Sequence, residues 1–264
     1  MKFSLYQESR TGARPDNQDR IGCFRSGDAL LMVVADGMGG HLNGEVAAEI
    51  AVQTLAGAFR RDARPRLADP LQFLRQGFNL AHDAIVGHCA AGPLTNTPRT
   101  TCVACVVQDS IAYWAHAGDS RLYHIRGARI RAQTRDHSRV RMLIDRGLLR
   151  EEEAGDHPDR NKIFSCLGGM MPPQVDVSNE TLLQPGDTLV LCSDGLWGPI
   201  PAEAICAALD ARDVGRAMPG LLDAAEAHAG RDCDNLSVVA ITWAGACAGG
   251  AQEVADAMDK DAGT

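Results

Sequence analysis

The sequence predicts an α+β fold in which sheets pack on sheets and helices cover them. Two observations support this prediction: strand-like segments fall into two groups along the chain, and amphipathic helical segments lie between and outside those groups. Turn-forming residues separate the short strand segments of the second group, which is typical of an antiparallel meander. With 264 residues, of which 45% are hydrophobic, the chain can build the core of one large domain or of two small ones.

The first hundred residues are predicted to form two strands and then two helices. Apolar and polar residues alternate over 3–9, and the apolar run within 28–36 is typical of a buried strand that ends at an acid and a glycine turn. Apolar residues then recur at helical spacing over 44–59 and again over 71–89. A loop that contains glycine and proline is expected at 92–98.

The rest of the chain is predicted to start with the meander and to continue with shorter elements. We expect residues 1–244 to form a single domain with an inserted mobile flap at about 139–172, because the sequence there is largely polar and poorly periodic, and a flexible tail at 245–264. The predicted meander strands are 101–108, 111–117, 121–126 and 129–134. Further strands are predicted at 175–182, 187–192 and 236–243, short helical pieces at 139–146 and 150–154, and helices at 202–211 and 214–229.

Composition and charge exclude several classes of protein. The formal net charge of −8 argues against a nucleic-acid partner. The N-terminus has no apolar signal core and no run approaches the roughly 18 apolar residues of a membrane span, so we expect no membrane association. Nine cysteines, mostly within apolar segments, indicate reduced core thiols in a cytoplasmic protein. Cys102 and Cys105 match a CxxC pattern, but their offset on a strand sends the thiols to opposite faces, which favours core packing.

Five short motifs that contain aspartate occur at positions where a strand should meet a loop. Such carboxylates converge only if the fold brings the strand ends together, and a cluster of mutually repelling acids indicates a cation among them. Hard divalent ions such as Mg²⁺ and Mn²⁺ take oxygen ligands, so the sequence predicts a carboxylate-rich metal site, with Arg14 just upstream as a phosphate anchor. The motifs are Asn17-Gln18-Asp19, Asp36-Gly37-Met38-Gly39-Gly40, Gly118-Asp119-Ser120-Arg121, Ser193-Asp194-Gly195 and Asp234-Asn235.

Taken in order, these motifs resemble those of the metal-dependent serine/threonine protein phosphatases of type 2C, the PPM family, and in particular its bacterial branch. One Asp-Gly turn after a strand is a weak signal, whereas seven motifs in order between about residues 4 and 243 are a strong one. The other matching pieces are Thr11-Gly12-Ala13-Arg14, Val34-Ala35, Thr100-Thr101, Thr134-Arg135-Asp136-His137-Ser138, Leu196-Trp197 and Leu236-Ser237-Val238.

The resemblance implies a fold and an activity. The fold is a central β-sandwich of two antiparallel sheets flanked by helices on both faces (α/β/β/α), with the metal site at one edge between the sheets. The activity is removal of phosphate from phosphoserine or phosphothreonine in proteins, which in a bacterium would reverse the action of a Hanks-type Ser/Thr kinase on its substrates. Two Mn²⁺ or Mg²⁺ ions would activate a bridging water or hydroxide and screen the phosphoryl oxygens, so that no covalent phosphoenzyme forms.

The resemblance also assigns roles to individual residues of the core metal site. Asp36 would bridge both ions, and the carbonyl of Gly37 would ligate one of them. Asp194 and Asp234 would hold the other ion through their carboxylates. Asp19 would act through a metal-bound water or as a nearby ligand.

Two further roles concern the substrate and a third ion. Arg14 would grip the substrate phosphate, because its planar guanidinium matches phosphate oxygens, and it forms the expected catalytic set with Asp19 and Asp36. A third, weaker metal site would use Asp119 and share Asp194.

One position departs from the family pattern. Many eukaryotic members carry a histidine directly after the Asp-Gly pair as the proposed general acid, whereas this chain has Met38, which cannot donate a proton. His41, three residues on, would face a different direction, so water is the expected proton source. The ratio of aryl-phosphate to phosphopeptide turnover should therefore be high, and a flat leaving-group dependence of the chemical step would contradict this.

Two other functions compete with hydrolysis. A catalytically weak or dead member would bind phosphoproteins as a regulatory module, but such members usually lose a metal aspartate, and this chain keeps Asp36, Asp194 and Asp234. A nucleotide-binding glycine loop at 37–44 is disfavoured, because the segment lacks both the GxGxxG spacing and a P-loop lysine. The sequence shows no apolar stripe that demands a partner, so a monomer is expected.

Several polar residues near the motifs have structural interpretations. Residues 136–138 are expected to close a turn before the next helix, with Ser138 as its N-cap. Arg121 is expected to pair with Asp119 or with a neighbouring acid. The arginine-rich stretch 135–150 is typical of a solvated face, although it could also attract acidic phosphopeptides.

Overall fold

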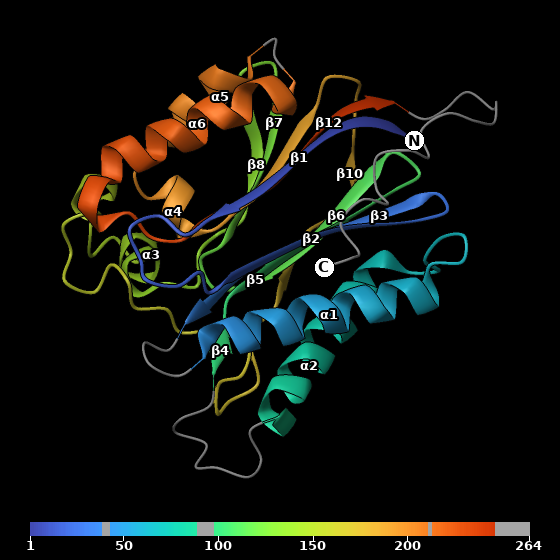
Figure 1. Ribbon diagram of the computed structural model, residues 1–264, viewed down its shortest axis with the longest axis horizontal. Helices are drawn as coiled ribbons and strands as arrows, with labels where there is room; N and C mark the ends of the chain where they lie inside the picture. Colours follow the sequence, from blue (N-terminus) through green and yellow to red (C-terminus); the bar gives the residue numbers. More distant parts are fainter. Residues whose placement is uncertain (39–42, 89–97, 211–212, 246–264) are drawn as a thin grey trace.

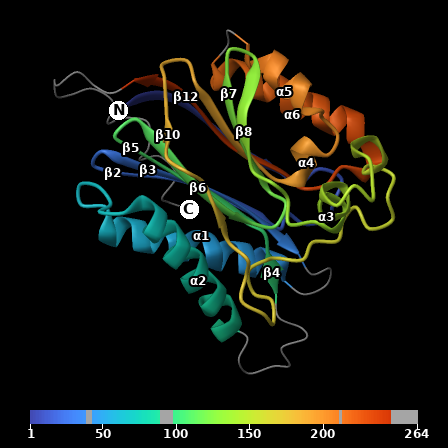
Figure 2. The ribbon, with the colours of Figure 1, turned by 180° about the vertical axis from the view of Figure 1, so that it is seen from behind.

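Two antiparallel β-sheets lie face to face in this computed structural model, with helices on both outer faces. Helices α1 (Gly44–Asp62) and α2 (Pro70–His88) cover one sheet, and α5 (Ala202–Leu209) and α6 (Val214–Ala229) cover the other (Figures 1 and 2). The predicted α+β sandwich with its α/β/β/α layers is thereby confirmed. The structure describes residues 1–38, 43–88, 98–210 and 213–245.

The sheet next to α5 and α6 has five strands in the order β1-β12-β11-β7-β8. Its first strand, β1, pairs antiparallel along its whole length with β12, the last strand of the described residues, which joins sequence segments more than two hundred positions apart. The strands are β1 (Lys2–Arg10), β7 (Arg121–Arg126), β8 (Arg129–Gln133), β11 (Thr188–Cys192) and β12 (Leu236–Gly245).

The sheet next to α1 and α2 has seven strands, with a main order of β10-β6-β5-β3-β2. Two short strands lie off this path, because β4 pairs with β3 and β9 pairs with β6. The strands are β2 (Asp19–Ser26), β3 (Ala29–Met38), β4 (Arg99–Thr100), β5 (Cys102–Gln108), β6 (Ile111–Ala117), β9 (Asp176–Val177) and β10 (Thr181–Leu182).

Three layers of buried apolar side chains hold the sandwich together. One lies under α1 and α2, one under α5 and α6, and the third between the two sheets. Alternation along β5 places Cys102 in the layer under α1 and α2 and Cys105 in the layer between the sheets. The opposite-face interpretation of the CxxC pair is therefore correct, and both thiols are free and buried.

The structure differs from the sequence prediction in several elements. Strands β2 and β4, the short helix Asp194–Trp197 and the 3₁₀ turn Gly230–Asp232 were not predicted. The strand expected at 175–182 is two separate two-residue strands, β9 and β10, and the helical piece expected at 150–154 is a 3₁₀ turn at Glu151–Glu153. The loop at 92–97, the helix ends at 89 and 211 and the tail after 245 lie outside the described residues.

Residues 139–172, here called the flap, begin with α3 (Arg139–Asp145) and contain few regular hydrogen-bonded elements. Isolated bridges join them to the rest of the fold, from Leu167 to Thr100 and from Ile163 to Ser138. Its predicted mobility stays a prediction. Of the six large hydrophobic side chains exposed in the described residues, four belong to the flap, namely Leu148, Phe164, Met170 and Met171.

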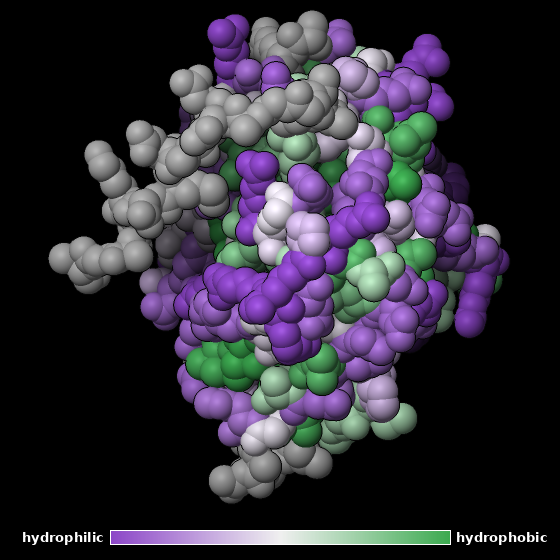
Figure 3. All heavy atoms as spheres, turned by 90° about the vertical axis from the view of Figure 1, so that its right-hand side faces the viewer, coloured by the Kyte–Doolittle hydropathy of each residue, from purple (hydrophilic) through white to green (hydrophobic). Residues whose placement is uncertain are grey.

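The rest of the visible surface is mixed in polarity. On the face in Figure 3, hydrophobic side chains form separate small areas among polar ones. Across the described segments, no helix is both long enough and apolar enough to cross a membrane.

Candidate metal and phosphate site

The five motif aspartates lie at strand ends of both sheets. Asp19 opens β2 and pairs in register with Asp36 near the end of β3. Asp119 lies in the turn that leads from β6 of one sheet to β7 of the other. Asp194 follows β11 closely, as the first residue of α4 (Asp194–Trp197), and Asp234 precedes β12. Segments from the whole length of the chain thus meet at one place.

The electrostatics of Asp36 show that the five carboxyls are neighbours. Burial raises the pKa of Asp36 well above its usual range, and the charges of Asp19, Asp194, Asp119 and Asp234 raise it further. All of these influences act in the same direction. A cation among the carboxyls would reverse this direction, because it would stabilise their ionised forms.

Three other members of the cluster show the same behaviour. Burial raises the pKa of Asp19 to about 6, and that of Asp119 also to about 6, with the charges of Asp234 and Asp136 respectively adding to the shift. Burial raises the pKa of Asp194 to about 8, with the charge of Asp119 as the next contribution. Buried carboxyl groups whose pKa values are raised by one another's charges are typical of a functional site.

The donor set fits a hard divalent cation. Every candidate ligand atom is an oxygen, which suits Mg²⁺ and Mn²⁺ and disfavours ions that seek thiolates. Asp19 and Asp119 are buried, whereas Asp36 and Asp194 keep partial exposure. The cluster is therefore held from behind and open on one side, as a site that receives ions and a substrate requires.

Gly37 occupies a position where only glycine fits. A Cβ atom there would lie 2.3 Å from the carbonyl oxygen of Gly44 and 2.6 Å from that of Gln18. The N–H of Gly37 donates to this same Gln18 oxygen. The backbone of three segments therefore packs closely directly beside Asp36.

Arg14 lies on the loop between β1 and β2 and reaches the cluster. Its Nη2 donates to Oδ2 of Asp234 at 2.7 Å, and the guanidinium remains half exposed. The loop is fixed by Ala13, whose N–H donates to the carbonyl of Cys233, and by Gly12, which has a φ of +63° and leaves no room for a Cβ beside Asp234. Arg14 can thus contact a phosphate at the open side of the carboxyl cluster.

Asn235 is a site residue whose role the sequence analysis missed. Its side-chain oxygen accepts from the N–H of Gln18, and its amide nitrogen donates to the carbonyls of Thr11 and Asp16. One side chain therefore fixes both ends of the loop that carries Arg14. The available signal was an amide side chain next to a motif acid, since Asn235 directly follows Asp234.

Hydroxyl groups form a second set of supports that the sequence analysis did not assign. Ser193 Oγ donates to Oδ2 of Asp19 at 2.8 Å and accepts from the N–H of Ser237. Thr101 Oγ1 accepts from the N–H of Asp36 and lies 2.6 Å from Ser120 Oγ. Each hydroxyl connects a motif acid with another segment, so the polar partners align the cluster.

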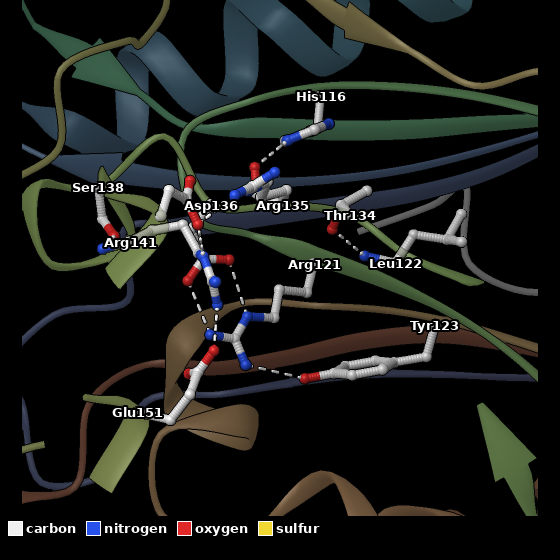
Figure 4. A network of polar contacts seen from close by, with 11 residues as sticks. His116, Arg121, Leu122, Tyr123, Thr134, Arg135, Asp136, Ser138, Arg141 and Glu151 are labelled. Atoms are coloured by element: carbon white, nitrogen blue, oxygen red, sulfur yellow. Dashed lines mark hydrogen bonds and ion pairs between the residues drawn. The ribbon is translucent and has the colours of Figure 1, made fainter. Parts of the chain in front are cut away.

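The structure confirms the expected roles of Ser138 and Arg121. Ser138 caps α3 by accepting from the N–H of Arg141. Arg121 pairs with the neighbouring acid Asp136 through two contacts of 2.8 and 2.7 Å (Figure 4). The guanidinium also stacks on Trp197 at 3.6 Å from the ring centre.

Comparisons with known proteins agree with this geometry. A family model described as protein phosphatase 2C matches residues 8–227. The serine/threonine phosphatase stp of Listeria monocytogenes serovar 1/2a is 34% identical over 199 residues, which cover 74% of this chain and 78% of the relative. The structure of the serine/threonine phosphatase Stp1 from Staphylococcus aureus gives a TM-score of 0.85 at 28% identity and covers 93% of this chain and 96% of that one.

A further solved structure contains metal ions. The catalytic domain of the serine/threonine protein phosphatase PstP, in complex with two manganese ions, gives a TM-score of 0.77 at 29% identity. The comparison covers 92% of this chain and 99% of that one. Arg14 and four of the five aspartates fall within the residues matched by the family model, and Asp234 lies just beyond them.

Proposed function

This chain belongs to the protein phosphatase 2C family, and from that premise we infer that it is a metal-dependent serine/threonine protein phosphatase with the five aspartates as its metal-binding centre. The observation that carries the proposal is the convergence of these carboxyls from both sheets beside Arg14. Carboxylates alone would repel a phosphate dianion, so the cluster needs divalent cations, Mn²⁺ or Mg²⁺, to accept this substrate.

The proposed ligands divide the cluster between two ions. Asp36, whose neighbours are the other four acids, would serve both ions, with the carbonyl of Gly37 as a ligand of one. Asp194 and Asp234 would serve the other, and Asp19 would act from the strand opposite Asp36. Bound there, two ions supply Lewis acidity, which lowers the pKa of a water and neutralises charge on the phosphoryl group.

Arg14 is proposed to orient the substrate phosphate. It now pairs with the Asp234 carboxylate, which presents oxygens much as a phosphate does. When Asp234 serves an ion, the guanidinium is free to turn to the phosphate on the exposed side. Because Met38 follows Asp36-Gly37 and cannot donate a proton, we propose that the leaving alkoxide takes its proton from water.

Asp119 is proposed to hold a third, weaker ion together with Asp194. The support is electrostatic, because after burial the charge of Asp119 contributes most to the raised pKa of Asp194. A cation between the two carboxylates would remove this repulsion.

The cellular setting can be proposed from the same family and from the thiols. The substrates are proteins that carry phosphoserine or phosphothreonine, and we propose that a Hanks-type kinase phosphorylates them. The seven cysteines of the described residues are all free, which is typical of the reducing cytoplasm. We propose that residues 1–244 act there as one catalytic domain and as a monomer.

A phosphothreonine peptide provides the direct test. We expect purified protein to release phosphate with Mn²⁺ and to stop when EDTA is added. Asp36→Ala should lose activity by at least about a hundredfold, since it removes the acid shared by both ions. Exposed Asp62→Ala on α1 is the matched control and should keep full activity.

The alternative regulatory module makes the opposite prediction. It requires that the wild-type protein bind Mn²⁺ and a phosphopeptide without turnover. Binding without hydrolysis, with p-nitrophenyl phosphate as well as with the peptide, would replace the phosphatase proposal by the binding module.

A further inference from the structure

His116, His137 and Asp176 form a compact group beside the proposed metal centre. One ligand-type atom of each lies within 4.8 Å of the others, which makes this the one triplet within the described residues with metal-binding spacing. The two imidazole rings are buried and stacked, with centroids 4.6 Å apart and planes inclined by 21°. A metal ion lies in the plane of each ligating ring, about 2.0–2.1 Å from its nitrogen, so nearly parallel stacked rings cannot share an ion.

Hydrogen bonds of the rings also argue against a metal ion. Nε2 of His116 donates to the carbonyl of Arg135 at 2.8 Å. Nδ1 of His137 accepts from the backbone N–H of Gly118 at 3.2 Å, so in the neutral ring the proton is on Nε2. This Nε2 lies 3.2 Å from Oδ2 of Asp176 without hydrogen-bond alignment. The nitrogen that would face an ion therefore carries a proton.

His137 instead forms hydrogen bonds with both backbone polar groups of Gly118, its N–H and its carbonyl. Its ring accepts from the Gly118 N–H, and its own backbone N–H donates to the Gly118 carbonyl at 2.9 Å. Gly118 has a φ of +108°, and a Cβ there would lie 2.6 Å from Cβ of Thr101. The residue is thus fixed in a conformation that L side chains rarely adopt.

Asp119 directly follows Gly118, and the next residue, Ser120, is also held by a side-chain contact. Ser120 Oγ lies 2.6 Å from Thr101 Oγ1, and this same Thr101 oxygen accepts from the N–H of Asp36. Asp119 therefore stands between one residue held by His137 and one held by the hydroxyl that supports Asp36. Its side chain is buried and carries no long flexible stem, so its position follows that of the backbone.

His137 also connects this turn to the flap. Its carbonyl accepts from the N–H of Phe164 at 2.8 Å, and the Phe164 ring lies against the imidazole with centroids 5.5 Å apart. The next residue, Ser138, forms a bridge with Ile163. One residue thus contacts both the flap and the turn that carries Asp119.

We propose that His137 is a positioning residue whose ring Nδ1 holds the Gly118 peptide and thereby sets the divalent-cation affinity of Asp119. The inference rests on the proposed function, because it takes Asp119 as a ligand of the weaker ion. Outer partners that orient a metal ligand typically change metal affinity by about 10- to 100-fold when removed.

Two variants of His137 distinguish the effect of its hydrogen-bond acceptor from the effect of its aromatic ring. His137→Phe keeps an aromatic ring against His116 and Phe164 but removes the acceptor, whereas His137→Asn places an oxygen near the position of Nδ1 and removes the ring. Mn²⁺ binding is measured by titration calorimetry and by the EPR signal of free Mn²⁺, neither of which depends on activity. We expect His137→Phe to weaken the weakest Mn²⁺ site by about 10- to 100-fold and His137→Asn to stay within about threefold of the wild type.

The chain offers a matched control in His82. Its Nδ1 accepts from the N–H of Gly168 at 3.2 Å, and that glycine also has a positive φ, of +81°. His82→Phe therefore removes the same kind of bond at α2 and should lower the melting temperature without changing Mn²⁺ binding. If His137→Phe does not fold, His137→Leu is measured in its place with the same expectation.

Asp119→Asn distinguishes failure of the inference from failure of the proposed function. If it leaves all Mn²⁺ sites unchanged, Asp119 is not a ligand, and the inference falls with that assignment. If it removes the weakest site while His137→Phe binds like the wild type, the positioning role is wrong. Equal weakening by His137→Phe and His137→Asn would also overturn it, because the ring rather than the acceptor would then matter.

Discussion

Asn235 shows how much of the site depends on residues that perform no chemistry. Its amide satisfies one N–H and two carbonyls of the loop that carries Arg14, and it lies next to Asp234 at the start of β12. The residue is only 7% exposed, so water cannot replace these partners. The neutral amide thus couples the phosphate anchor to a metal-binding acid.

Replacing this amide should therefore cost both stability and substrate affinity. We expect Asn235→Ala to lower the free energy of unfolding by about 2–3 kcal/mol, since three hydrogen bonds of roughly 1 kcal/mol each are lost in a buried place. KM for a phosphopeptide should rise because the Arg14 loop is released. Urea unfolding measures the first effect. Gln53→Ala, which removes an exposed amide bonded to Glu49 on α1, is the control and should change stability by less than about 0.5 kcal/mol.

The ionisation of Asp194 makes the metal-free protein sensitive to pH. Its pKa is raised to about 8, against about 3.9 for an aspartate in an unfolded chain. Between these values the folded state binds more protons than the unfolded state, so the contribution of Asp194 to stability falls as pH rises from about 4 to 8. Burial is the first cause of this shift and the charge of Asp119 the second.

Asp194→Asn should remove this loss. In EDTA, we expect the free energy of unfolding of the variant, relative to the wild type, to increase steadily between about pH 5 and pH 8. With added Mn²⁺ the wild type should instead be the more stable of the two proteins, because the ion binds the ionised Asp194 carboxylate, which the variant lacks. Urea unfolding at several pH values across this range decides the matter, and a difference between the two proteins that is constant with pH would contradict the raised pKa.

Among the elements, the long helices α1, α2, α5 and α6 and the buried strands could be predicted and β2 could not. Strand β3 lies inside its sheet and is buried on both faces, so its sequence is a continuous apolar run. Strand β2 is at the end of the same sheet and only partly buried, and it contains Gly22 and charged residues. An edge strand leaves a weak apolar pattern, even though this one places Asp19 opposite Asp36.

Replacing either of two glycines by alanine should change the free energy of unfolding, but in opposite directions. Gly57 lies on the exposed side of α1, and a Cβ there would have no atom within 4 Å, so Gly57→Ala should raise the free energy of unfolding by about 0.5–1 kcal/mol and leave activity unchanged. Gly37→Ala should lower it by about 1–3 kcal/mol and weaken Mn²⁺ binding, because the methyl would meet the Gly44 carbonyl. Thermal unfolding with and without Mn²⁺ compares them, and the same sign for both would contradict the packing described.

At the scale of the whole molecule, the site is made by sheet pairing rather than by any local segment. The sequence indicated that the acids must meet, since repelling carboxylates at strand ends need a common cation. It did not indicate which strands are neighbours, because the pairing of β1 with β12 and of β11 with β7 joins distant segments. The hydrogen-bond partners Asn235, Ser193 and Thr101 could not be assigned for the same reason, as their bonds cross from one segment to another.

The central claim is that the five aspartates hold the divalent cations. Its most direct test is a crystal structure with Mn²⁺, in which anomalous scattering near the manganese edge locates the ions independently of any assumption about ligands. We predict two strong peaks within about 2.0–2.6 Å of carboxylate oxygens of the cluster, with Asp36 in contact with both. Peaks at His116 and His137, or none within reach of Asp36, would contradict the account.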